Sequence, residues 1–100
     1  MPGARVCLQF ISSAVGGRAS PAVLNEDYRP HFRVEDGEYL GVQFVAGGDA
    51  PAPIGVPVDA RVTFPYAPRV NYEPLRSGVQ FQVLEGRRIV GVGVVTELTA

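Results

Sequence analysis

The stretch VQFQVLEGRRIVGVGVV, residues 79–95, decides the fold. Apolar residues alternate with glutamines in its first half: Val79, Phe81 and Val83. Valines alternate with Gly91 and Gly93 in its second half: Val90, Val92 and Val94. Period-2 alternation on both sides of a short polar turn with a glycine, Glu85-Gly86-Arg87-Arg88, predicts a β-hairpin. Gly91 and Gly93 share one face of the second strand, where glycine permits close approach of a neighbouring chain.

Working outward from this hairpin, the same alternation predicts four more strands, over residues 5–11, 28–35, 38–45 and 58–64. Their expected inward side chains include Val6, Leu8, Phe10, Phe32, Val34, Leu40, Val42 and Phe44. Asp36-Gly37 is a strong signal for a two-residue hairpin turn between the second and third strands. Helical periodicity is lacking, so the chain is predicted to be all-β. Six short strands favour a small six-stranded antiparallel closed β-barrel, because closure removes exposed sheet edges.

The connections between these strands are rich in glycine and proline. Residues 12–27 form a predicted loop of about 16 residues, and loops of that length are uncommon unless they function or pack back on the core. Two interpretations remain open for it, a cover over one barrel end and a binding loop. Residues 46–57 and 65–75 are predicted to be connections within the barrel rather than domain linkers.

The composition predicts one domain, residues 1–100, with no strong attraction to polyanions. Nine basic residues, all arginines, face ten acidic ones, which gives a net charge of −1 and a pI near 5.7. That balance offers no global attraction for nucleic acid or an acidic membrane. The chain lacks an apolar run of roughly 18 residues and a signal-peptide hydrophobic region, so we expect no membrane association and a cytoplasmic location.

Catalytic and metal-binding patterns are sparse. A P-loop requires a lysine, which the chain lacks, so no nucleotide is expected. Cys7 is the single cysteine and His31 the single histidine, which argues against a disulfide or a zinc site. The two could form a nucleophile pair if their strands were neighbours, although a buried cysteine and a strand-face histidine are the commoner roles. We therefore predict no enzyme activity, no metal and no cofactor.

Arginines supply the candidate binding surface. Arg18, Arg29 and Arg33 surround the first long loop and the second strand, and Arg87 and Arg88 lie at the last turn. Guanidinium groups bind phosphate through paired hydrogen bonds, but exposed turns also carry charge without any ligand. A functional surface would require that these groups lie together in the folded chain.

Three motifs together resemble the C-terminal barrel domain of elongation factor Tu. They are Gly16-Gly17-Arg18, Tyr28-Arg29-Pro30-His31-Phe32 and the segment EGRRIVGVGVV at residues 85–95, in the family's order and spacing. The resemblance covers nearly the whole chain and implies a six-stranded antiparallel barrel without catalytic residues. In that family the domain contacts the T stem of aminoacyl-tRNA, the GTPase domain and the nucleotide exchange factor. The matching positions here are Arg18, Arg29, His31, Gly86 and Arg87.

The functional prediction is therefore a non-catalytic binding module, whose candidate surface comprises Arg18, Arg29, His31, Arg33, Gly86, Arg87 and Arg88. The acidic pI favours a protein partner, including self-association. An RNA-binding domain that uses the arginine turns is the alternative. A third hypothesis, a small enzyme or ligand carrier, would require a polar pocket near Cys7 or His31 rather than a filled barrel.

Overall fold

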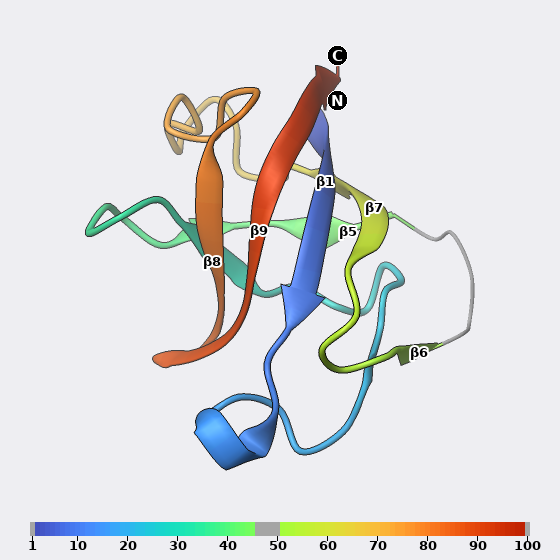
Figure 1. Ribbon diagram of the computed structural model, residues 1–100. Coiled ribbons are helices and arrows are strands. Elements are labelled where there is room, and N and C mark those ends of the chain that lie inside the picture. Colours follow the sequence, from blue (N-terminus) through green and yellow to red (C-terminus); the bar gives the residue numbers. More distant parts are fainter. Residues whose placement is uncertain (1, 46–50, 100) are drawn as a thin grey trace.

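The strands of this chain wrap around one hydrophobic interior in a computed structural model, which describes residues 2–45 and 51–99. The elements, in chain order, are β1 (Gly3–Phe10), the 3-10 helix η1 (Ser13–Val15), β2 (Ala22–Val23), β3 (His31–Arg33), β4 (Leu40–Gly41), β5 (Gln43–Phe44), β6 (Pro51–Ala52), β7 (Val58–Thr63), β8 (Gln80–Glu85) and β9 (Arg88–Thr99). In Figure 1, β8, β9 and β1 lie side by side across the front of the molecule.

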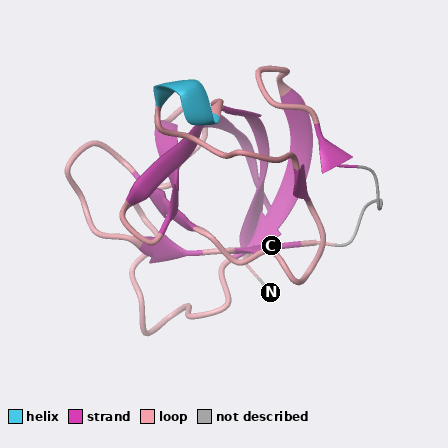
Figure 2. Cartoon of the chain, turned by 90° about the horizontal axis from the view of Figure 1, so that it is seen from below, coloured by secondary structure: helices cyan, strands magenta, loops and turns pink. Residues whose placement is uncertain are grey.

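Seven of these strands form one antiparallel sheet in the order β4-β3-β8-β9-β1-β7-β5. Its two edge strands, β4 and β5, are halves of one extended segment. The amides of Val42 and Phe44 donate to the carbonyls of Pro30 and Tyr28, at 3.1 and 3.2 Å, while the Val45 amide donates to the Arg61 carbonyl at 3.0 Å. The segment therefore forms hydrogen bonds with both β3 and β7, which brings the two edges of the sheet together. The sheet is nearly closed into the predicted small all-β barrel (Figure 2).

Aromatic rings from β3, β5 and β8 fill the barrel interior. Phe32 stacks on Phe81 with 4.0 Å between ring centroids and meets Phe44 edge-on at 6.2 Å. The inward residues predicted for the first and third strands are buried, which confirms the alternation there: Val6, Leu8, Phe10, Leu40, Val42 and Phe44. Val34, predicted to face inward, is only partly buried. The filled interior follows from the small diameter of a six-stranded barrel, which leaves room only for side chains.

The closing hairpin is confirmed, with Gly86-Arg87 as its two-residue turn between β8 and β9. Gly86 has a φ of 63°, whereas Arg87 does not enter the positive-φ region, as in a type II′ turn. A Cβ at this glycine would meet nothing within 4 Å, so the backbone conformation alone requires glycine.

The alternation of β9 is interrupted by a bulge that the sequence pattern did not predict. Val83 pairs with Gly91 but Leu84 pairs with Ile89, so Val90 is an extra residue in β9. Val90 is consequently buried, while Val92 is 47% exposed on the outside. Gly91 and Gly93 turn inward instead, and the close approach predicted for them is confirmed: a Cβ at Gly93 would lie 2.7 Å from the Cys7 carbonyl oxygen.

The predicted two-residue hairpin at Asp36-Gly37 is wrong. β3 ends at Arg33 and β4 begins at Leu40, so the connection has six residues. The Gly37 amide donates to the Val34 carbonyl at 2.9 Å, which makes Glu35 and Asp36 the central residues of the turn. Glu35 accordingly has a φ of 52°, the one non-glycine residue with positive φ in residues 2–45 and 51–99.

The long loop at residues 12–27 packs back on the core. Ala22 in β2 pairs with Ala52 in β6, and both are buried members of the core cluster. This small two-stranded sheet is separate from the barrel wall and was not predicted. Part of the predicted connection at 46–57, residues 46–50, lies outside the described residues.

Candidate functional site

The long loop presents Arg18 at a defined position. Gly17 is buried, and a Cβ there would lie 2.0 Å from the Ile11 carbonyl oxygen, so only glycine fits. The Gly17 amide donates to the Ser12 carbonyl at 2.8 Å and the Arg18 amide to the Ile11 carbonyl at 2.9 Å. These bonds hold the loop against the end of β1 and direct Arg18 toward the barrel.

Arg18 pairs with Glu85, the last residue of β8, which also accepts a hydrogen bond from Tyr28. The Arg18 guanidinium forms an ion pair with Glu85 Oε2, and the Tyr28 hydroxyl donates to the same oxygen at 2.6 Å. Arg18 also donates to the Ser20 carbonyl at 2.8 Å and lies over the Tyr28 ring, 5.7 Å from its centroid. Within the described part of the chain this is the only ion pair. The ion pair and the Tyr28 hydrogen bond therefore link the long loop to the end of β8 and to the segment that precedes β3.

Burial raises the pKa of the Tyr28 hydroxyl, and the hydrogen bond to the Glu85 carboxylate raises it further. Because the folded state holds this proton more tightly than the unfolded chain, the resulting stability is present below about pH 10 and is lost as pH rises above it. Burial raises the pKa of Tyr72 as well.

We therefore expect the free energy of unfolding to fall above pH 10, and to fall less steeply in Tyr28→Phe. The slopes of unfolding free energy against pH should differ between wild type and Tyr28→Phe by at most about 1.4 kcal/mol per pH unit. Solvent screening of the partly exposed ring reduces this difference. Urea denaturation between pH 8 and 11 measures it, with the exposed Tyr39→Phe as control. Parallel pH profiles for wild type and Tyr28→Phe would contradict the assignment.

A second group of candidate residues lies on the outer side of β3. Arg33 donates to Gln82 Oε1 of β8 from two nitrogens, at 3.0 and 3.3 Å, and its guanidinium lies 5.5 Å from the Tyr39 ring centroid. The His31 ring lies 5.8 Å from the same tyrosine. On β4, the Tyr66 ring covers Gly41, the register partner of His31, where a Cβ would lie 2.7 Å from the ring. We call these four residues the β3 surface: His31, Arg33, Tyr39 and Tyr66.

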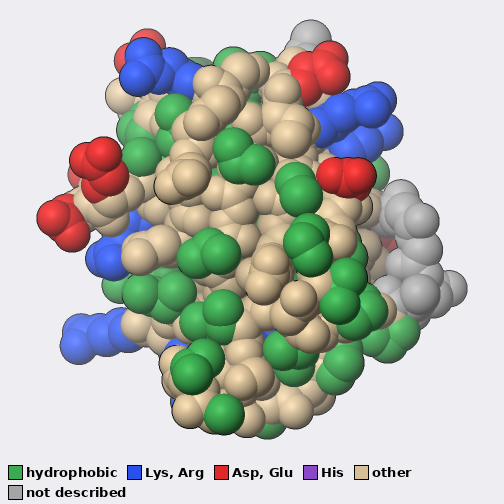
Figure 3. Space-filling view, in the orientation of Figure 1, with side chains coloured by type: hydrophobic (Ala, Val, Ile, Leu, Met, Phe, Trp, Pro, Cys, Tyr) green, Lys and Arg blue, Asp and Glu red, His purple; other side chains and the backbone are tan. Residues whose placement is uncertain are grey.

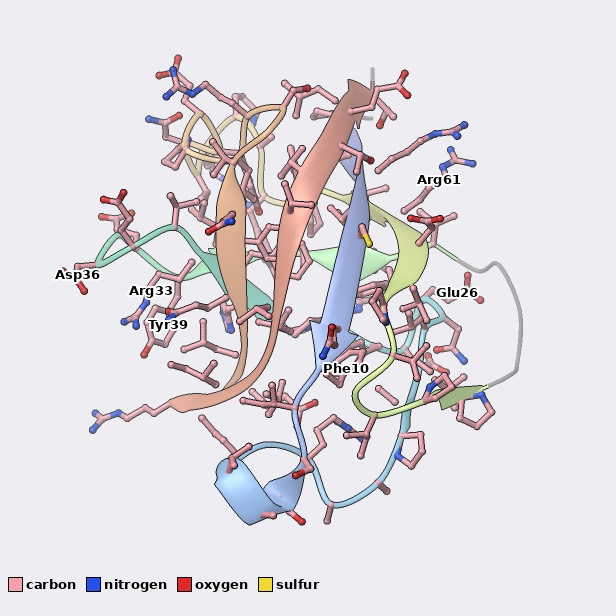
Figure 4. All side chains as sticks on the ribbon, viewed as in Figure 1. Phe10, Glu26, Arg33, Asp36, Tyr39 and Arg61 are labelled. Carbon is pink, nitrogen blue, oxygen red and sulfur yellow. The ribbon has the colours of Figure 1, made fainter. Side chains whose placement is uncertain are left out.

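The β3 surface is exposed and has acidic neighbours. Tyr39 is 41% and Tyr66 46% exposed. Glu35, Asp36 and Glu38 are exposed on the turn that leads from β3 to β4. Figure 4 shows Arg33, Tyr39 and Asp36 together on one side of the barrel, with Arg61 on the opposite side. The β3 surface therefore combines aromatic rings with one guanidinium, and a carboxylate cluster lies beside it.

The remaining candidates occupy the loop before β3 and the closing turn. Arg29 is exposed and its Nε lies 3.5 Å from the Glu26 carbonyl. Gly86, Arg87 and Arg88 are exposed at the tip of the β8–β9 hairpin, next in sequence to Glu85. The ion pair thus brings Arg18 close to the hairpin arginines, as a shared binding surface requires. The charge of Arg18, however, is already compensated by Glu85.

The suggested Cys7–His31 nucleophile pair is wrong, because the two residues are not on neighbouring strands. Cys7 is in β1 and His31 is in β3, with β9 and β8 between them. Among residues 2–45 and 51–99, no group of three or more His, Cys, Asp and Glu side chains lies close enough to hold a metal ion.

Sequence reasoning missed Tyr39 and Tyr66. Tyr39 precedes the inward Leu40 in a predicted strand, so alternation alone marks it as outward. Tyr66 follows β7 in a proline-punctuated loop, and nothing local predicts that its ring covers Gly41.

A scan of the sequence against models of known protein families finds no match. In the part of the chain that the structure describes, no helix has the length and apolar character of a membrane span.

Proposed function

We propose that this protein is a non-catalytic binding module, similar to the C-terminal barrel domain of elongation factor Tu, that binds a protein partner through the β3 surface. The observation that supports it is two exposed tyrosines, Tyr39 beside His31 and Arg33, and Tyr66 over Gly41. Gly41 is the register partner of His31. Tyrosine and arginine are enriched among the residues that dominate protein–protein binding energies. The resemblance to the elongation factor domain also supports a translation-related role in the cytoplasm.

The charges around the β3 surface favour a protein over an RNA partner. Glu35, Asp36 and Glu38 lie beside it and would repel a phosphate backbone. A protein partner can complement both signs of charge, with basic groups opposite these carboxylates and acidic groups opposite Arg33. Arg18 is already paired with Glu85, which removes one guanidinium from the candidate phosphate contacts.

RNA binding is the second candidate function, supported by the same aromatic rings. Bases stack on tyrosine and histidine rings and on guanidinium planes, and the β3 surface offers all three. Arg29, Arg87 and Arg88 are exposed and available for phosphate. Binding of this kind weakens steeply with salt, because phosphate contacts release counterions.

Affinity capture from an extract of the native host tests the protein-binding proposal. Immobilised wild type is compared with the double variant Arg33→Glu/Tyr39→Ala and with the control Arg76→Glu, an exposed arginine on a loop. We expect one protein to be retained by wild type and control, and to bind the double variant roughly 30-fold more weakly, the loss typical of a hot spot. Retention that is equal on all three would contradict the β3 surface as the site.

The RNA alternative is distinguished by nuclease treatment and by a direct titration. Capture that survives nuclease supports a protein partner. A fluorescence titration with tRNA at about 50 mM and 200 mM salt should then show no binding at either concentration. Binding through phosphate contacts would instead lose much of its affinity between these two salt concentrations. Tight, strongly salt-dependent tRNA binding would overturn the protein proposal in favour of RNA.

A further inference from the structure

The outward residues of β1 and β9 form a second surface, on a different side of the barrel from Tyr39. From β1 it presents Arg5, Cys7 and Gln9, which alternate with the buried Ala4, Val6, Leu8 and Phe10. From β9 it presents Val92, Val94 and Glu97. We call this set the β1–β9 face.

The register between the two strands pairs these residues across the sheet: Arg5 with Glu97, Cys7 with Val94, and Gln9 with Val92. Among these six residues, charge is thus confined to one end. The neighbouring strands add two charged residues at the margins, Asp59 of β7 beside Cys7 and Arg33 of β3 beside Gln82. Figure 3 shows this side of the molecule, with neutral and hydrophobic side chains over its centre and charged side chains toward its margins. Gln80 and Gln82 of β8 extend the uncharged area, since they pair with Val94 and Val92.

Two features of the β1–β9 face favour the binding of another molecule. Val92 is 47% exposed at the end of the face away from Arg5 and Glu97, next to a shallow depression of ≈ 630 Å³. The lining of this depression includes Cys7, Gln9 and Gln82 and, toward β3, the charged residues Arg33 and Glu35. Arg5 pairs in register with Arg61 of β7, and like charges directly opposite each other on neighbouring strands are unfavourable. Arg5 and Glu97 are not joined by an ion pair in the described residues, so both charges are open to a partner.

We propose that the occupant is a second copy of this chain, which docks face to face and is related to the first by a two-fold axis. This axis lies in the interface, parallel to β1 and β9 and above the line midway between them. Such an axis places each β1 residue opposite the β9 residue with which it pairs in its own sheet. Arg5 of each copy then faces Glu97 of the other, and the contact occurs twice because a two-fold interface is self-complementary.

The same axis matches the uncharged part of the face. Val92 of each copy lies over Gln9 of the other, at the depression that Gln9 lines, and Cys7 lies opposite Val94. The Glu97 carboxylate of the second copy also arrives beside the Arg5–Arg61 pair, where it offsets the like-charge contact. Arg33 of the β3 surface also lines this depression, but Arg5 and Glu97, where the dimer is tested, lie outside the β3 surface. The two proposals can therefore fail separately.

Sedimentation equilibrium over about 5 µM to 1 mM protein tests the proposal by charge reversal. We expect wild type to dimerise, and Arg5→Glu and Glu97→Arg each to weaken the dimer roughly tenfold or more, because each turns two attractive contacts into two repulsive ones. An equimolar mixture of the two variants should recover the dimer as a mixed pair, since the reversed charges of one copy then meet those of the other. Arg87→Glu, the same charge change at the far hairpin tip, is the matched control.

Alkylation of Cys7 provides a second measurement that does not depend on the variants' stability. Cys7 is the single cysteine and lies in the face, so its reaction rate should fall as wild-type protein concentration rises through the dimerisation range. A wild type that stays monomeric at 1 mM, or a dimer that neither reversal weakens, would overturn the proposal. A concentration-independent alkylation rate in a wild type that dimerises would place the interface elsewhere and overturn it equally.

Discussion

Phe32→Ala is expected to lower the free energy of unfolding by about 3–5 kcal/mol, the usual cost of removing a buried phenylalanine ring. Phe32 is fully buried, stacks on Phe81 at 4.0 Å and meets Phe44 edge-on. Alanine would leave a cavity in the middle of the barrel, which strands held on both sides by hydrogen bonds cannot collapse to fill. Small domains are stable by only about 5–15 kcal/mol in total, so this loss removes a large fraction of the stability expected for such a chain.

Urea denaturation followed by far-UV circular dichroism measures this loss, and tyrosine fluorescence gives a second probe since the chain has no tryptophan. Tyr39→Ala is the matched control, because it also removes an aromatic ring but from a side chain that is 41% exposed. Its cost should stay below about 1 kcal/mol. If the two substitutions cost the same, the ring stack is not the centre of the core.

Gly93→Ala has the second largest expected effect, a loss of about 1–3 kcal/mol through overpacking. The added methyl group would lie 2.7 Å from the Cys7 carbonyl oxygen, 2.7 Å from the Phe81 ring and 2.9 Å from the Leu8 Cβ. Backbone crowds it on one side and packed core on the other, so neither can move without breaking other contacts. The usual benefit of replacing glycine, a smaller entropy of the unfolded chain, is about 0.4–1 kcal/mol and offsets only part of the loss.

Val92→Ala is the control for Gly93→Ala, because it changes the adjacent residue of β9 on the outer side of the wall. Val92 is 47% exposed, and its truncation should change the free energy of unfolding by less than about 1 kcal/mol. The same urea series measures both variants. A neutral Gly93→Ala would mean that β1 does not approach β9 as closely as the structure shows.

The candidate site was only partly predictable from sequence. Outward positions on a strand follow from alternation, so Arg33 and Tyr39 could be assigned to the surface in advance. The partner of Arg18 could not, because Glu85 is 67 positions away and only the folded barrel brings the two together. Tyr66 was missed for a similar reason, since its ring contacts Gly41, which belongs to a distant segment of the chain.

By itself, the sequence determined the β-character of the chain, the inward faces of the first and third predicted strands and the closing turn. These are local properties: alternation selects a face, and a glycine with positive φ selects a turn. Only the tertiary structure decided the bulge at Val90, which moves Val92 to the outside and the two glycines to the inside. It also decided that two strands separate Cys7 from His31. Register and strand order depend on hydrogen bonds and packing between distant segments, for which a single strand's pattern carries no information.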